Sequence, residues 1–250
     1  MRDVVRAAFV EFTSPMEGVV PWMYLDLKGL VTTAIGNLID PVQIALPLPW
    51  VHMDGSPASR AEIATEWMRV HGDPVAAKRG HLYTKGITSL RLTDEGVQMV
   101  VSRRLSQMDQ YLASRFGQEY EEWPADAQLA TLSMSWACGP AFRFPALEAA
   151  LRARDFRAAS IHCHMNEAGN PGLVPRNRCN VTLYRNADKV QMGKLDPSHL
   201  DWVNDVSLGE AATPPDLSVY DAEPVRLNES TASLPTTWPG PPDDEPPAAA

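Results

Sequence analysis

The chain has 250 residues, of which 44% are hydrophobic and 21% are charged, and this composition is typical of a globular protein. Its net charge of −9 is uneven, because the segment from Gly209 onward holds eight acidic residues and one arginine. Residues 1–208 are therefore nearly neutral, which argues against a nucleic-acid-binding surface. No apolar run is long enough to cross a membrane. Asp3 and Glu11 interrupt the apolar residues near the N-terminus, so a secretory signal is not predicted and we expect folding in the cytoplasm.

Residues 2–13 are expected to form the first helix. Their apolar side chains recur at helical spacing, at Val4, Val5, Ala8, Phe9 and Phe12. We expect Ser14 and Pro15 either to kink this helix or to start a separate turn that carries Glu17. Gly18 suits the end of a helix, because glycine tolerates the left-handed conformation.

Two short runs of strand-forming residues lie on either side of Lys28–Gly29, within residues 24–35. They predict a β-hairpin that holds Asp26 and Thr32 near each other, with Glu17 projecting from the preceding helix end. Two carboxylates at one site suit the cleavage of a glycosidic bond. One must be protonated to donate to the leaving oxygen, and the other must be ionised to activate water or to attack.

The segment 39–91 begins with several prolines and contains one clear helix, for which residues 59–62 form a capping box. A loop over residues 80–86 is expected to line the substrate cleft. Trp50 and Trp67 suit either of two roles, stacking on sugar rings or packing this segment onto the body. Packing is favoured, because large aromatic side chains dominate the energetics of cores.

The longest helix is predicted over residues 94–116, with Thr93 as its N-cap and Gly117 at its end. Its buried face is expected to consist of Val97, Val101, Leu105, Met108, Leu112 and Phe116. Burying six such side chains at ~1.5–3 kcal/mol each is enough to anchor a lobe.

Further helices are expected over residues 124–139, 145–153, 155–166, 172–184 and 194–207, with Pro124 at the first helical position. From Gly209 the chain has nine prolines in 42 residues and is strongly acidic. Such a composition cannot bury a core, so this tail is predicted to be disordered.

The three cysteines, Cys138, Cys163 and Cys179, do not predict a disulfide framework, because the set is sparse and odd. The run His162-Cys163-His164 raises the alternative of a zinc site, but the paired spacings typical of zinc ligands are missing. We favour buried, reduced thiols and surface histidines, and we expect no metal and no cofactor.

Glu17, Asp26 and Thr32, with eight and five residues between them, resemble the catalytic signature of phage-type lysozymes, the endolysin muramidases. That family's glycine and tyrosine landmarks fall at Gly18, Tyr24, Gly29 and Gly36. Residues 129–139 resemble its Ser-Phe-x-Phe-Asn-x-Gly helix, with Cys138 as a departure near the usual asparagine. Residues 172–178 resemble its Gly-Leu-Val-x-Arg-Arg motif.

The resemblance implies an α+β fold in which a small β-hairpin lobe and a larger helical lobe are joined by a long helix. It implies a catalytic domain over residues 1–208, with 39–91 as an insertion, followed by the tail over 209–250. Arg176 would lie close to the catalytic glutamate, with Arg178 as second choice. The alternative is that both arginines are solvated charges at a helix N-terminus.

The implied activity is hydrolysis of the β-1,4 bond between N-acetylmuramic acid and N-acetylglucosamine in peptidoglycan, with inversion at the anomeric carbon. Glu17 would be the general acid, kept protonated by an apolar environment. Asp26 would stay ionised and either activate the water or stabilise the transition state, while Thr32 would hold that water. Tyr24 and Asn37 would bind substrate or support the site.

Two departures from the family pattern, together with Pro15 and the insertion, indicate a divergent branch. Ala34 and Asn37 stand where the family usually has a glycine and a histidine. Ala34 has less backbone freedom than glycine, and Asn37 forms hydrogen bonds but carries no charge.

Two other functions stay open: a lysozyme-like module that binds glycan or a partner protein without cleaving, and a lytic transglycosylase, which Asp26 and Thr32 disfavour. The enzyme would reach the periplasm or cell wall of its target either as a phage endolysin or as a secreted antibacterial effector. The insertion and the acidic tail favour the effector. Peptidoglycan glycan strands are the expected partner, and an immunity protein or a secretion-machine component is a candidate for a further one. Neither nucleic acid nor a membrane is expected as a partner.

Overall fold

The computed structural model describes residues 1–26, 28–168 and 172–201. The chain divides into a unit of residues 1–212 and a second of residues 213–250, and every described residue belongs to the first. The tail predicted from Gly209 lies outside the described residues. So does the second half of the helix predicted over 194–207, and residues 194–201 form turns instead of a helix.

The fold is α+β and mostly helical, as the sequence predicts, and it begins with α1 (Asp3–Glu17). This helix continues through Pro15, so the alternative of a separate turn that carries Glu17 is wrong. The proline lies in the last turn, where its missing N–H and its ring disturb only the end of the helix. The Ser14 hydroxyl donates to the Val10 carbonyl oxygen at 2.6 Å, and Gly18, with a φ of 72°, ends the helix as predicted.

The predicted hairpin is confirmed. Strands β1 (Val20–Leu25) and β2 (Val31–Ala34) are antiparallel, with Tyr24 opposite Thr32. A third strand, β3 (Asn37–Leu38), which the sequence did not predict, pairs with β2. The sheet order is therefore β1-β2-β3.

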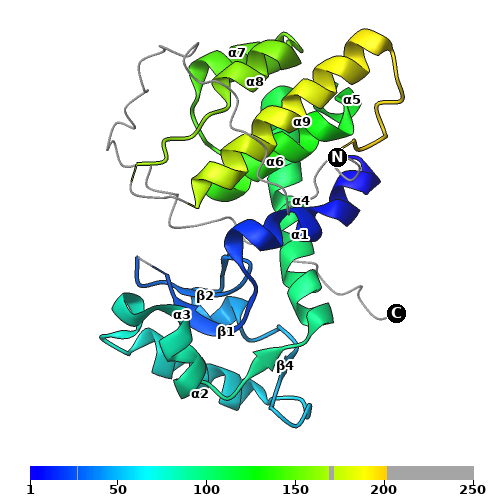
Figure 1. The fold of residues 1–250 in the computed structure, drawn as a ribbon. Helices are drawn as coiled ribbons and strands as arrows, with labels where there is room; N and C mark the ends of the chain where they lie inside the picture. Colours follow the sequence, from blue (N-terminus) through cyan, green and yellow to red (C-terminus); the bar gives the residue numbers. More distant parts are fainter. Residues whose placement is uncertain (27, 169–171, 202–250) are drawn as a thin grey trace, which may run out of the picture. The chain divides into compact units, whose positions relative to one another are not determined.

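The segment predicted as an insertion forms several elements: η1 (Val42–Ile44), β4 (Trp50–Val51), α2 (Arg60–His71), α3 (Ala76–Ile87) and β5 (Arg91–Leu92). The capping box is confirmed at the start of α2, and β4 and β5 pair as an antiparallel two-stranded sheet. The loop predicted over 80–86 is wrong. These residues belong to α3, which bends at Gly80, where φ is 72°, and packs against β1 (Figure 1).

Trp50 and Trp67 belong to the buried core, so the sugar-stacking role is wrong for both. They are only 1% and 8% exposed. The Trp50 Nε1 donates to the Ala45 carbonyl oxygen at 3.0 Å, and the Trp67 Nε1 to the Ile39 carbonyl oxygen at 2.9 Å. Buried indole N–H groups of this kind need such partners.

Helix α4 (Asp94–Phe116) is the longest helix, and the apolar face predicted for it is buried in full. Thr93 caps it, because its hydroxyl oxygen accepts the Gly96 N–H at 3.1 Å. The helix contacts β2, β3 and β5 as well as α1, α6 and the short α5 (Glu119–Glu122) (Figure 1). None of the helices in the described ranges is long and apolar enough to cross a membrane.

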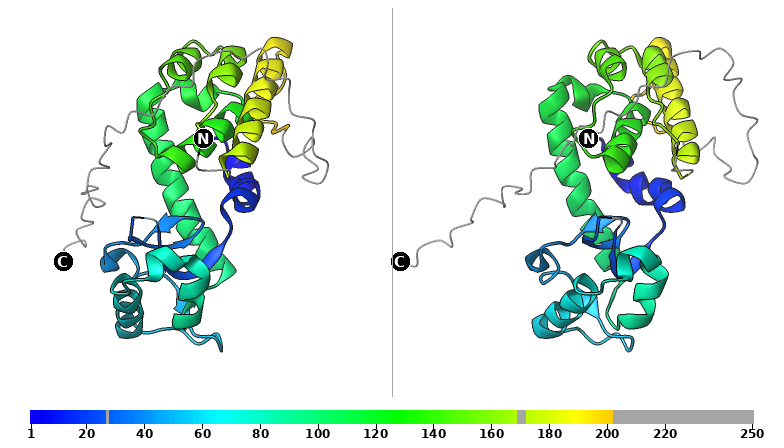
Figure 2. Two further views of the ribbon diagram at one scale, coloured as in Figure 1. Left: turned by 60° about the vertical axis from the view of Figure 1, so that its left-hand side comes forward. Right: turned by 90° about the vertical axis from the view of Figure 1, so that its left-hand side faces the viewer.

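The remaining helices are α6 (Ala125–Cys138), α7 (Pro145–Arg152), α8 (Phe156–His162) and α9 (Leu173–Gly193). Pro124 precedes α6 as its N-cap and is not its first residue. Helix α9 runs well beyond the predicted end at Tyr184, because Ala187 and Val190 extend its buried face. Figure 2 shows α9 packed beside α6 and α8.

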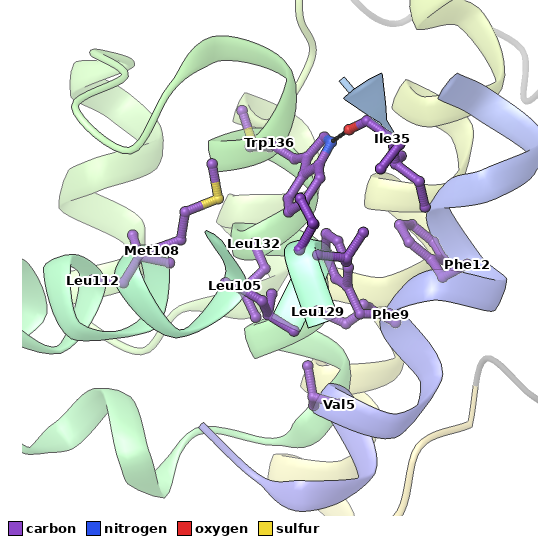
Figure 3. Close-up of a cluster of buried hydrophobic side chains, with 14 of the residues drawn as sticks. Val5, Phe9, Phe12, Ile35, Leu105, Met108, Leu112, Leu129, Leu132 and Trp136 are labelled. Atoms are coloured by element: carbon purple, nitrogen blue, oxygen red, sulfur yellow. Dashed lines mark hydrogen bonds between the residues drawn. The ribbon is translucent and has the colours of Figure 1, made fainter. Parts of the chain in front are cut away.

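A cluster of buried apolar side chains joins α1, α4 and α6 to the hairpin (Figure 3). At its edge the Trp136 Nε1 donates to the Ile35 carbonyl oxygen at 3.1 Å, and the rings of Trp136 and Phe9 lie 4.9 Å apart. This bond fixes the hairpin against α6 and so positions the residues that follow.

Candidate functional site

Glu17 and Arg176 form an ion pair between the end of α1 and the first turn of α9. Arg176 Nη2 donates to Glu17 Oε1, while Arg176 Nη1 donates to both the carbonyl oxygen and the Oγ of Ser133 at 3.1 Å. The arginine side chain is 1% exposed and that of Glu17 is 31% exposed. Arg176 therefore lies where the family resemblance placed it, whereas Arg178 is exposed.

Helix electrostatics explain why this pair suits its position. Glu17 lies at the carbonyl end of α1, where the helix dipole disfavours a negative charge, and Arg176 lies at the amide end of α9, where it disfavours a positive one. Each charge offsets the unfavourable dipole that the other meets. Burial lowers the pKa of Arg176, and the charge of Glu17 opposes that shift.

The apolar environment expected around Glu17 is not present. Its side chain is about one-third exposed and is bound to a guanidinium through Oε1. Its other oxygen, Oε2, has no hydrogen-bond partner within the described parts of the chain. The carboxyl thus has one oxygen held in place and one oxygen open to a ligand.

Asp26 follows β1 in the hairpin turn and is partly buried. Its Oδ1 accepts the backbone N–H groups of Lys28 at 2.8 Å and Leu30 at 2.9 Å. These bonds, an Asx turn, orient the carboxylate. For Oδ2, no partner occurs among the described residues, so Asp26 too has one anchored and one open oxygen.

Tyr24 lies within electrostatic reach of both carboxylates. Burial, together with the charges of Asp26 and Glu17, raises the pKa of its phenol to about 12, while Arg104 opposes the shift. The phenol therefore keeps its proton at neutral pH and remains a hydrogen-bond donor.

Arg104, on α4, is a site residue that sequence reasoning missed. Its Nη1 donates to the Gly36 carbonyl oxygen, and its guanidinium lies 4.4 Å from the centre of the Trp136 ring. Burial lowers its pKa to about 10, and Glu17 and Tyr24 counter that shift. The sequence did hold one signal for this residue: Arg104 lies seven residues after Val97, and therefore on the face of α4 predicted to be buried.

Thr32 is 4% exposed, and its hydroxyl donates to the Leu30 carbonyl oxygen at 3.1 Å. Only its acceptor lone pairs remain for a water, so its part in holding the nucleophile stays a prediction. Asn37 is buried, with its amide nitrogen 3.4 Å from the Val100 carbonyl oxygen and its Oδ1 accepting the Ile35 N–H. Asn37 therefore supports the hairpin from within, and a substrate contact by it is wrong.

Ala34 has a φ of 53°, the left-handed conformation that glycine adopts readily. The methyl group of Ala34 adds a steric cost of about 1–2 kcal/mol in this conformation. The strands pair next to it, where Thr33 lies opposite Asn37.

The cysteines differ from one another. Cys163 is buried, as expected, but Cys138 is exposed, and its Sγ lies 3.3 Å from the Met165 Sδ. His164 pairs with Glu167 at 3.6 Å. Throughout residues 1–26, 28–168 and 172–201, no three His, Cys, Asp or Glu side chains are placed to hold a metal ion.

A surface hollow of about 520 Å³ lies in the insertion, away from these carboxylates. It is lined by His52, Met53, Asp54, Ser56 and Ser89. None of the residues predicted from the family resemblance lines it.

The structure thus brings together two carboxylates, a phenol and two guanidiniums: Glu17, Asp26, Tyr24, Arg104 and Arg176. Such a set can donate a proton from one carboxyl and accept one at the other, which is the requirement for general acid–base hydrolysis. Neither the protein-family models nor the curated proteins compared with this chain give a match.

Proposed function

We propose that this protein is a peptidoglycan hydrolase of the lysozyme type, with a lysozyme-like arrangement of hairpin and helices. It cleaves the β-1,4 bond between N-acetylmuramic acid and N-acetylglucosamine. The observation that carries the proposal is the pair of carboxylates within electrostatic reach of Tyr24, each with one oxygen anchored and one open. Glycosidic bonds are cleaved by two carboxyl groups with distinct roles.

Glu17 is the general acid in this proposal. Its Oε1 stays on Arg176, and a proton carried by Oε2 passes to the glycosidic oxygen as the bond to the anomeric carbon breaks. The anchored oxygen fixes the plane of the carboxyl group, so the open oxygen is aimed before substrate arrives.

Asp26 is the general base. Its Oδ1 is held by two backbone N–H groups, and Oδ2 accepts a proton from the water whose oxygen bonds to the anomeric carbon. The Thr32 hydroxyl oxygen is the second acceptor for that water. After product release, Asp26 gives its proton to solvent and Glu17 takes up a proton from solvent.

Tyr24 and Arg104 act on the charges of this site. Tyr24 keeps its phenolic proton and donates it in a hydrogen bond to substrate or to a carboxylate oxygen. Arg104 adds a fixed cation beside Glu17 and Tyr24, which offsets the negative charge of the two carboxylates. Both residues therefore orient or stabilise charged species without transferring a proton.

The stereochemistry follows from the use of a water on the face opposite the leaving group, so the proposal includes inversion. Proton NMR of the first products from a soluble glycan oligomer tests this. An α-configured product at early times agrees with inversion. A β-configured product would mean retention, with Asp26 acting as the nucleophile and not as the base.

The activity itself is tested with purified peptidoglycan. The wild-type protein should release soluble muropeptides with free reducing ends, and Glu17→Gln and Asp26→Asn should release far fewer. Anhydro-muropeptides in place of reducing ends would indicate lytic transglycosylation. Binding of peptidoglycan without any release would indicate a non-catalytic glycan-binding module.

We propose delivery as a secreted antibacterial effector, with a phage endolysin as the alternative. The supporting observations are the insertion over residues 39–91 and the acidic tail. Genes next to the coding sequence distinguish the two, since an effector is accompanied by secretion-system and immunity genes and an endolysin by holin and tail genes.

A further inference from the structure

The inserted segment carries a concentration of positive charge that the proposed reaction does not use. Between Asp73 and Asp94 the sequence has no acidic residue, although the whole chain has a net charge of −9. The basic residues in this interval are Lys78, Arg79, His81, Lys85 and Arg91. In the described ranges, none of their side chains forms an ion pair.

Three of these residues surround Trp22 on β1. The Trp22 Nε1 donates to the His81 carbonyl oxygen at 2.8 Å, and the two rings lie 6.1 Å apart. Lys85 Nζ lies 5.1 Å and Arg91 Cζ 5.3 Å from the centre of the Trp22 ring. We call Trp22, His81, Lys85 and Arg91 the Trp22 patch. Cations at these distances gain cation–π stabilisation and are held in place.

The patch is ordered but keeps free charge. The Arg91 guanidinium donates to the carbonyl oxygens of Leu90 and Lys85, which fixes the end of α3. His81 and Lys85 are exposed, so their charged or polar ends face solvent. An exposed ammonium that has no carboxylate partner within the described residues is available to an anionic ligand.

The patch also adjoins the candidate active site. The rings of His81 and Tyr24 lie 6.2 Å apart, and Tyr24 interacts electrostatically with Glu17 and Asp26. The residues of the patch thus continue from Tyr24 along β1 and α3. A polymer bound across the carboxylates would extend over them.

We propose that the Trp22 patch is a subsite for the carboxylates of the peptides attached to the glycan strand. This inference rests on the muramidase function proposed above. The N-acetylglucosamine units are uncharged, whereas the stem peptides carry carboxylates at regular intervals along the strand. Lys85 and His81 bind these groups, so the enzyme prefers peptide-bearing strands to stripped ones.

The test compares two substrates with Lys85→Gln and Lys85→Glu. One substrate is intact peptidoglycan, and the other is the same glycan after an amidase has removed the stem peptides, which leaves a lactyl carboxylate on each N-acetylmuramic acid but no peptide carboxylate. On intact material, KM should rise about threefold for Lys85→Gln and about tenfold for Lys85→Glu with kcat nearly unchanged, in the range of single exposed charge interactions. On stripped strands, both variants should equal the wild type.

Lys189→Glu is the matched control. It makes the same charge change at an exposed position on α9, thirteen residues and about 20 Å along the helix from Arg176. It should leave KM unchanged on both substrates, which separates a local subsite from a general effect of net charge.

The outcomes are distinct. If the wild type cleaves both substrates and Lys85→Glu changes KM equally on both, the peptide subsite is wrong and the muramidase function stands. If the wild type cleaves neither substrate, the proposed muramidase function itself is contradicted. If Lys85→Glu leaves KM unchanged but abolishes the binding of a labelled oligonucleotide, as measured by fluorescence anisotropy, the patch binds a different polyanion and the inference is overturned.

Discussion

The guanidinium of Arg176 binds the carboxyl group of Glu17 across 159 positions of the chain. The same guanidinium reaches back to Ser133 on α6, so a single side chain ties α1, α6 and α9 together. Because Arg176 is buried and Glu17 is about one-third exposed, the pair presents its acidic side outward. This polarity leaves Glu17 Oε2 open, and it is the atom that donates the proton in the proposed reaction.

Arg176→Lys should destabilise the fold and lower activity. A lysine ammonium cannot donate hydrogen bonds to Ser133 and Glu17 in two fixed directions, as the planar guanidinium does. We expect the free energy of unfolding, measured by chemical denaturation, to fall by about 1–3 kcal/mol, because buried polar groups lose their hydrogen-bond partners.

Arg178→Lys is the control for that variant, because Arg178 is exposed on the same helix. Its free energy of unfolding should stay within about 0.5 kcal/mol of the wild type, as surface substitutions do. Equal denaturation midpoints for the two variants would show that the Glu17–Arg176 pair contributes nothing to stability.

Arg104→Gln should lower kcat about tenfold, because it removes the cation that interacts with Glu17 and Tyr24. Steady-state kinetics on peptidoglycan measure this change. Arg103→Gln alters the exposed neighbouring arginine and should stay within about twofold of the wild type. A similar loss in both variants would assign the effect to the net charge of α4 and remove Arg104 from the site.

Glu66 should be essential for the stability of the insertion. It is 2% exposed, and its carboxylate accepts the Ser89 N–H at 2.6 Å and the Leu90 N–H at 3.0 Å. Glu66→Ala leaves both donors unpaired and should cost about 2–5 kcal/mol in the free energy of unfolding. Glu66→Gln keeps one acceptor oxygen and should cost less. Identical thermal unfolding of the two variants would contradict this account of α2 and β5.

Cys138 should react slowly with thiol reagents at neutral pH in spite of its exposure. Burial of the sulfur raises the pKa of this thiol, and the charge of Arg176 only partly offsets that shift. A raised pKa means less thiolate at a given pH, so alkylation should be slower than for a free cysteine and should keep accelerating at pH values where a free cysteine has already reached its full rate. Burial raises the pKa of Cys163 to about 12, so it should stay unmodified.

Mass spectrometry of iodoacetamide adducts measures both sites in one experiment. Modification of Cys138 at about pH 7 as fast as that of a small free thiol would show that its surroundings do not raise the pKa of this thiol. Glutathione under the same conditions gives the reference rate.

The hairpin and α4 could be predicted because local pattern and tertiary packing agree there. The six apolar residues expected on α4 are all buried, and Tyr24 pairs with Thr32 as a short hairpin requires. Glu17 and Asp26 stand in one local motif, whereas the closeness of Arg176 to Glu17 was expected only from the family resemblance of residues 172–178, since 159 positions separate the two.

Other features depend on packing that a local pattern does not encode. The strands β3, β4 and β5 have two residues each, too few for an alternating pattern. Two glycines predicted a loop over 80–86, but packing against β1 keeps this stretch helical with a bend at Gly80. The sequence places Arg104 on the predicted buried face of α4, but only the fold brings it within electrostatic reach of Glu17.

The most direct test of the central claim is the release of soluble muropeptides from purified peptidoglycan by the wild type and by Glu17→Gln, with both proteins shown to be folded. The account predicts reducing-end muropeptides from the wild type and a loss of at least about a hundredfold in the variant, within the range of general-acid catalysis. Equal release by both proteins would remove Glu17 as the acid, and no release by the wild type would contradict the proposed function.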